Sequence, residues 1–274
     1  IYGINLSTSA ISIITNKVSQ AATEWQNRPL ESLYMIVWMD GIVFKVRENG
    51  KVINKTVYLC VGLNKEGLKE VLGMWIGKNE SAAFWMGVLT DLKARGVEDI
   101  LITVTDNLNG FTETIKSVFP ASTTQICVVH QIRNSCRYVV WKEKKEFTAD
   151  LKNIYNAPTK EAAEMELDNF EQKWGAKYPY AIRSWRNNWE ELTVFFDFPV
   201  EIRKIIYTTN LIENLNGKIR KYTKNKLSFP NDDALKKSVY LAINEIEKKW
   251  YQPIWNWALI FNQFITIFEN RIQV

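Results

Sequence analysis

The chain has 274 residues, of which 46% are hydrophobic and 24% are charged. These ordinary globular values exclude a largely disordered protein, and the length suits one α/β domain that carries an insertion. The net charge of +5 is modest, so any surface that binds a polyanion depends on where the charges lie.

The first expected elements are a helix and three strands. Ser7 or Thr8 can cap a helix that Pro29 ends, and half of a helix-turn-helix is an alternative interpretation. β-branched and aromatic residues then predict an antiparallel meander, with an Asn-Gly turn after its first strand. Its strands are expected at residues 34–47, 51–63 and 69–77.

Two more strands alternate with helices. We expect a helix at 80–95, a strand at 99–105, a helix at 108–118 and a strand at 124–129. The crossover helix should lay the fourth strand parallel to the first, which gives a mixed sheet. Residues 130–203 have a helical pattern, and Glu213 opens another helix. The apolar stretch 255–268 is shorter than the roughly 20 residues that a membrane span needs, so we expect a buried terminal helix.

Two carboxylates stand out at strand positions. Asp40 interrupts the apolar first strand, and Asp106 ends the fourth. A charge inside a strand is costly unless it is paired or binds a metal ion. If the two strands are parallel neighbours about 4.8 Å apart, both carboxylates can reach one ion. The alternatives are a strand break at Asp40 and a helix N-cap at Asp106.

Glu213 is the one acid among seven basic residues between Arg203 and Lys226. That stretch favours a surface facing a polyanion, although a solvated helix face is the alternative. Asn210 and Glu213 also fit a capping box loosely. The helical projection predicts an apolar stripe of Ile212, Leu215, Ile219 and Tyr222. On another face it groups Glu213 with Thr209, Asn216, Gly217, Arg220 and Lys224.

Two Asp and one Glu are sufficient ligands for two Mg²⁺ or Mn²⁺ ions, which keep water and substrate oxygens in their other positions. Two ions about 3.5–4 Å apart can activate an attacking hydroxyl and stabilise the leaving oxygen of a phosphodiester. The sequence has no glycine-rich phosphate loop, so ATP is not expected as a substrate.

His130 is the only histidine, three residues after Cys127. We expect it to hydrogen-bond near the acidic cluster; a core histidine and half of a zinc site are the alternatives. Three widely spaced cysteines without a secretory signal favour a reducing, cytosolic compartment.

DNA contacts are expected in the insertion and on the helix of Glu213. Trp185 and Trp189 alternate with arginines and could stack on nucleotides, while burial of both tryptophans is the alternative. The predicted DNA-binding residues are Arg133, Arg183, Trp185, Arg186, Asn216, Lys218, Arg220, Lys221 and Lys224.

Several long segments resemble the Mutator-type transposases of bacterial insertion sequences, in the same order along the chain. They include MDGIVFKVRENG, TDNLNGF, CVVHQIRNS, KYPYAIRSWRNNWEELTVFF and SFPNDD. The resemblance implies a ribonuclease H-like core with an all-helical insertion and a DDE triad at Asp40, Asp106 and Glu213. It also implies that Cys127 and His130 are the C-x-x-H motif that supports the active site.

The implied activity is metal-dependent cleavage at transposon ends, followed by strand transfer to target DNA. The partners would be double-stranded terminal inverted repeats, target DNA and further copies of this chain, as a homodimer or larger. The expected division is a tail of the N-terminal DNA-binding region and linker (1–30), the first part of the core (31–130), the insertion (131–205) and C-terminal core helices (206–274). Because only a tail of the N-terminal region is recognised, a non-catalytic DNA-binding remnant is the alternative.

Overall fold

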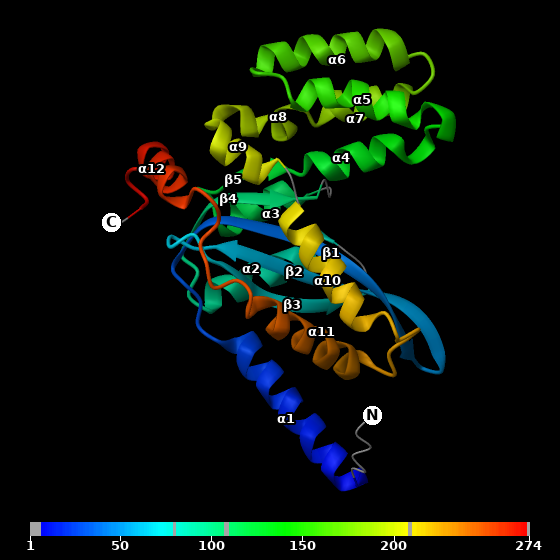
Figure 1. Ribbon diagram of the computed structural model, residues 1–274, viewed down its shortest axis with the longest axis vertical. Coiled ribbons are helices and arrows are strands. Elements are labelled where there is room, and N and C mark those ends of the chain that lie inside the picture. The colour runs from blue at the N-terminus through cyan, green and yellow to red at the C-terminus, as the bar shows by residue number, and fades with distance from the viewer. Residues whose placement is uncertain (1–6, 79–80, 107–109, 208–209, 273–274) are drawn as a thin grey trace.

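The computed structural model describes residues 7–78, 81–106, 110–207 and 210–272, which form a mixed sheet with helices on both faces (Figure 1). The sheet order is β3-β2-β1-β4-β5. β1, β2 and β3 form an antiparallel meander, and β4 and β5 continue the sheet in parallel. This topology confirms the predicted ribonuclease H-like fold class. The strands are β1 (Leu33–Glu48), β2 (Lys51–Leu63), β3 (Lys69–Gly77), β4 (Asp99–Thr105) and β5 (Thr123–Ile126).

The predicted Asn-Gly turn joins β1 to β2. Asn49 and Gly50 have φ values of 51° and 76°, and Glu48 pairs with Lys51 across the two-residue loop. Two positive φ angles give a turn whose twist matches that of the strands. Loop length and turn type together fix the register of the hairpin, and so the face on which Asp40 lies.

One face of the sheet is covered by α2 (Ala82–Ala94) and α3 (Phe111–Val118). Trp85 stacks on Phe111 with ring centroids 4.5 Å apart, and both pack in a cluster with residues of β1. The N-cap of α3 is Gly110 in the left-handed region, so the N-cap alternative for Asp106 is wrong. The expected starts of these two helices at residues 80 and 108 lie outside the described residues.

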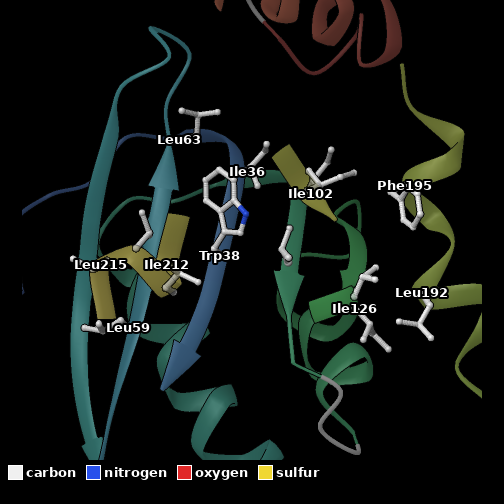
Figure 2. Close-up of a cluster of buried hydrophobic side chains, with 14 of the residues drawn as sticks. Ile36, Trp38, Leu59, Leu63, Ile102, Ile126, Leu192, Phe195, Ile212 and Leu215 are labelled. Carbon is white, nitrogen blue, oxygen red and sulfur yellow. The ribbon is translucent and has the colours of Figure 1, made fainter. Parts of the chain in front are cut away.

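The other face is covered by α10 (Asn210–Thr223) and α11 (Asp232–Glu247). Figure 2 shows Ile212 and Leu215 of α10 in the same buried cluster as Trp38 of β1. The predicted apolar stripe therefore holds for its first three members. Tyr222 is 56% exposed, because the cluster along α10 ends at Ile219; its assignment to the buried stripe is wrong.

The segment between β5 and α10 is helical, as predicted, and lies beyond one end of the sheet (Figure 1). Gln125 of β5 attaches it: its side-chain amide donates to Leu192 O at 2.8 Å and accepts from Phe195 N at 2.7 Å. The residue division given above stays a proposal. The helices are α4 (Val128–Ser135), α5 (Lys144–Tyr155), α6 (Lys160–Trp174), α7 (Pro179–Asn187), α8 (Trp189–Leu192) and α9 (Val200–Ile206), with 3₁₀ turns at Cys136–Tyr138, Trp141–Glu143 and Val194–Asp197.

The two terminal helices are α1 (Thr8–Asn27) and α12 (Trp257–Ile267). Ser7 caps α1 through a 3.1 Å hydrogen bond from Ala10 N, as expected. The prediction that residues 255–268 form a buried helix is only partly right, since α12 buries Ile260 and Phe264 while Trp255 is exposed. Within the described ranges, no helix is both long and apolar enough to cross a membrane.

Candidate active site

The sheet brings Asp40 and Asp106 level with each other. β1 and β4 are parallel, and Trp38 pairs with Val104. Asp40 lies two residues further along β1, on the same face as Trp38 because side chains alternate with a period of two. Asp106 directly follows Thr105, the last residue of β4, and its carboxylate lies near that of Asp40. Asp40 lies within a continuous β1, so the strand-break alternative is wrong. The prediction that the first and fourth strands are parallel neighbours is confirmed.

Asp40 is held from two sides. Gly41 N donates to its Oδ1 at 2.7 Å, and Asn216 Nδ2 of α10 donates to its Oδ2 at 2.6 Å. Glycine is needed at position 41, since a Cβ there would lie 2.6 Å from Cγ2 of Thr56. The carboxylate is therefore fixed in orientation, with further lone pairs for a cation.

The charge environment of Asp40 is unusual for a carboxylate. Its burial, at 8% exposure, and the nearby charge of Asp106 raise the pKa of Asp40 to about 6. His130 and the Gly41 amide oppose the shift, and the charge of Glu213 adds to it. A divalent cation would relieve this repulsion, which is the electrostatic condition for a metal site.

The Cys127-x-x-His130 motif forms the start of α4. Cys127 is the N-cap, and its Sγ accepts from His130 N at 3.3 Å. The Cys127 amide donates to Thr105 O at 2.7 Å, which places the start of α4 beside the end of β4. This cap ends β5 at Ile126, so the expectation that Val128 and Val129 continue the strand is wrong.

His130 faces the acidic pair. Its Nδ1 lies 2.6 Å from Asp106 Oδ1, and its Nε2 lies 4.0 Å from Asp40 Oδ1. Burial lowers the pKa of His130, but its contacts with Asp106 and Cys127 outweigh burial and raise that pKa to about 11. The imidazole thus carries a charge that balances the carboxylates at neutral pH. Its expected place near the acidic cluster is confirmed.

The donor atoms of Asp40, Asp106 and His130 lie within 4.8 Å of one another. Asp106 Oδ1 and His130 Nδ1 are buried, and despite their 2.6 Å contact neither has a partner with hydrogen-bond geometry among the described residues. Two carboxylate oxygens suit Mg²⁺ or Mn²⁺, so the residues fit a divalent ion. Cys127 is not part of the cluster found in the described residues, which disfavours a zinc site there.

Glu213 lies beside this cluster but outside it. Its Oε1 is 2.7 Å from a guanidinium nitrogen of Arg133. Its negative charge contributes to the raised pKa of Asp40. Asn216, one turn further along α10, makes the direct contact with Asp40. The three predicted carboxylates therefore occupy one region, but in this conformation only two share a donor cluster. The capping role considered for Asn210 rests on a side chain outside the described part of the structure.

The predicted DNA-binding residues have divergent surroundings. Arg220 and Lys221 are exposed on α10, and Lys224 is exposed just after it; all three stay predictions, as do Lys218 and the exposed Arg183. Trp185 is 2% exposed and its indole donates to Ser135 Oγ at 2.8 Å, so a stacking role for it is contradicted by burial. Arg186 binds Asp168 and Glu171, which occupy its guanidinium.

Sequence reasoning missed two contacts in the site. The sequence groups Asn216 with Glu213 and predicts that Asn216 contacts DNA, but its side chain binds Asp40 instead. The signal for this contact is the spacing of three residues between Glu213 and Asn216, which puts both on one face of α10. Arg133 was expected to bind DNA, and the pairing of Arg133 with Glu213 has no local signal in the sequence.

The strand topology with two level carboxylates defines a ribonuclease H-like protein. The chain belongs to the Mutator family of transposases, since the family profile described as "Transposase, Mutator family" matches residues 1–253. The "Transposase for insertion sequence element ISRM3" of Rhizobium meliloti (strain 1021) is 44% identical over 272 residues, 99% of this chain and 68% of that protein. A "Probable transposase for insertion sequence element" of Corynebacterium diphtheriae is 40% identical over 90% of this chain and 72% of its own length.

A solved structure with partial similarity is the "Drosophila P element transposase strand transfer complex", with a TM-score of 0.45 and 8% identity over 90% of this chain and 86% of that chain. The similarity is too low to support an argument about activity. The family assignment comes from sequence, and it makes this chain a transposase of the insertion-sequence type.

Proposed function

We propose that this chain catalyses metal-dependent DNA strand cleavage and strand transfer at the ends of an insertion sequence. The observation that carries the proposal is the convergence of Asp40, which is buried, with the half-buried Asp106 and His130 in one donor cluster. Two Mg²⁺ or Mn²⁺ ions, when bound, would activate the attacking hydroxyl and stabilise the leaving oxygen.

Asp40 and Asp106 would hold the ions from adjacent strands, and Glu213 would add a ligand from α10. Gly41 and Asn216 orient the Asp40 carboxylate, so it is aligned before an ion arrives. With a pKa of about 6, Asp40 is largely ionised at pH 7 and above, as a ligand must be. His130 supplies positive charge beside Asp106.

The DNA partner would be double-stranded, both at the terminal inverted repeats and at the target, with at least two copies of the chain in the complex. Exposed cations at the end of α10 and just after it, close in sequence to Glu213, support a contact with the DNA backbone next to the site: Arg220, Lys221 and Lys224. Joining two DNA ends needs two active sites, which supports the dimer.

The alternative is a DNA-binding remnant without catalysis. It is favoured by the position of Glu213, which is paired with Arg133 and lies outside the donor cluster. In that case DNA binding persists, but Mg²⁺ or Mn²⁺ produces no nicking.

A nicking assay separates the two. Supercoiled plasmid carrying the terminal repeats is incubated with the protein and Mg²⁺ or Mn²⁺, and Asp40→Ala, Asp106→Ala and Glu213→Ala are compared with Glu113→Ala, an exposed acid on α3 across the sheet. We expect the three site variants to lose cleavage and keep DNA affinity, while the α3 variant cuts normally. Normal cleavage by any site variant would refute the role given to that residue.

A further inference from the structure

One ion pair joins the helical insertion to the catalytic core at the edge of the site. Arg133 comes from the last turn of α4, and Glu213 from the first turn of α10. A guanidinium nitrogen lies 2.7 Å from Glu213 Oε1. The Arg133 side chain is 56% exposed and that of Glu213 is 24% exposed, so the pair faces solvent on its arginine side.

Helix α4 supplies one cation to each of two acids. His130 and Arg133 are three residues apart and share a face of the helix. His130 contacts Asp106, while Arg133 contacts Glu213. The positive charges that a metal cluster would bring to these carboxylates are thus supplied in this conformation by side chains of one helix.

Arg133 and a metal ion would compete for the same carboxylate. A divalent ion bound by Glu213 would be repelled by the positive charge of a guanidinium held next to it. The ion would also occupy the carboxylate oxygens to which the guanidinium could otherwise donate two hydrogen bonds. An ion pair this exposed adds little to stability, so exchanging it costs the fold little.

We propose that Arg133 is a positioning residue that competes with the metal cluster for Glu213 and releases it when a divalent ion binds, a release that bound DNA favours further. The freed guanidinium then pairs with a DNA phosphate, for which its planar donors are well suited. This inference rests on the proposed role of Glu213 as a metal ligand. It couples substrate binding to assembly of the site, because metal and DNA each favour the released state.

The test measures Mn²⁺ affinity of the full chain without DNA, by isothermal titration calorimetry at one pH. Arg133→Gln should bind Mn²⁺ several-fold more tightly than the wild type, because the competitor is gone. Arg137→Gln is the matched control: it removes the same charge from an exposed position four residues on, which stacks on Tyr138. It should leave Mn²⁺ affinity within twofold.

DNA affinity, measured with Ca²⁺ in place of Mn²⁺, should fall in Arg133→Gln. Thermal unfolding of each variant shows whether the fold is intact. If Arg133→Gln leaves Mn²⁺ affinity unchanged or weakens it, or if Arg137→Gln tightens it equally, the exchange proposal is overturned.

Glu213→Gln distinguishes failure of this inference from failure of the proposed function. It should weaken Mn²⁺ binding, and Arg133→Gln should add no tightening in that background. If Glu213→Gln binds Mn²⁺ like the wild type, the ligand role of Glu213 fails, and the exchange fails with it. If Glu213→Gln weakens binding while Arg133→Gln alone does not tighten it, only the exchange fails.

Discussion

Asn216→Ala tests whether the orientation of Asp40 matters to metal binding. The substitution removes the 2.6 Å hydrogen bond from Asn216 Nδ2 to Asp40 Oδ2 and leaves a buried carboxylate oxygen without that donor. A hydrogen bond to a charged group contributes about 1.5–3 kcal/mol, and loss of such a partner of a metal ligand typically costs about 10–100-fold in affinity or activity. We expect a loss of Mn²⁺ affinity in that range.

The assay is calorimetric titration with Mn²⁺, with DNA affinity measured in parallel. Asn214→Ala is the matched control, since Asn214 is exposed on the same helix two residues earlier. Asn216→Ala should lower metal affinity and leave duplex affinity near that of the wild type, while Asn214→Ala should change neither. A selective loss of DNA affinity in Asn216→Ala would refute the reasoning and restore the residue to the DNA-contact set.

Three further predictions concern pH, the attachment of the insertion and the DNA surface. The pKa of Asp40 is about 6 in the fold against an ordinary value of 3.8, so its ionised form destabilises the fold above pH 6. In EDTA, the free energy of unfolding of Asp40→Asn should therefore gain about 2–3 kcal/mol relative to that of the wild type as pH rises from 4 to 6, and the difference should then stay level to pH 8; a difference that does not change with pH would contradict this. Gln125→Leu leaves Leu192 O and Phe195 N buried without their hydrogen-bond partner. It should lower the free energy of unfolding in urea by about 2–4 kcal/mol and speed amide exchange around residues 192–195. The control Gln172→Leu, at an exposed position, should leave the free energy of unfolding unchanged. Changing Arg220, Lys221 and Lys224 to Gln should reduce the slope of log DNA affinity against log salt by about 2–3; an unchanged slope would remove these three residues from the DNA surface.

The sheet was largely predictable because its signals are local. The Asn49-Gly50 turn and the runs of β-branched residues set the first three strands to within one residue of those observed. The handedness and crossover rule then placed β4 beside β1, and with it Asp106 level with Asp40. The alternation of side chains along a strand and the crossover rule were therefore enough to predict that Asp40 and Asp106 lie close together.

What the sequence could not supply depends on contacts between distant segments. The residues after β5 have β-branched side chains, yet the sulfur of Cys127 caps a helix there, which propensity does not foresee. The burial of Trp185 follows from packing within the insertion and its bond to Ser135. The pairing of Arg133 with Glu213 joins two helices that only the tertiary fold brings together.

The most direct test of the central claim is a crystal structure of the chain with bound Mn²⁺, read from its anomalous scattering. The account predicts an anomalous peak between Asp40 and Asp106, with the carboxylate of Glu213 turned away from Arg133 and toward the ion. Anomalous density absent from the space between Asp40 and Asp106 at saturating Mn²⁺ would contradict it.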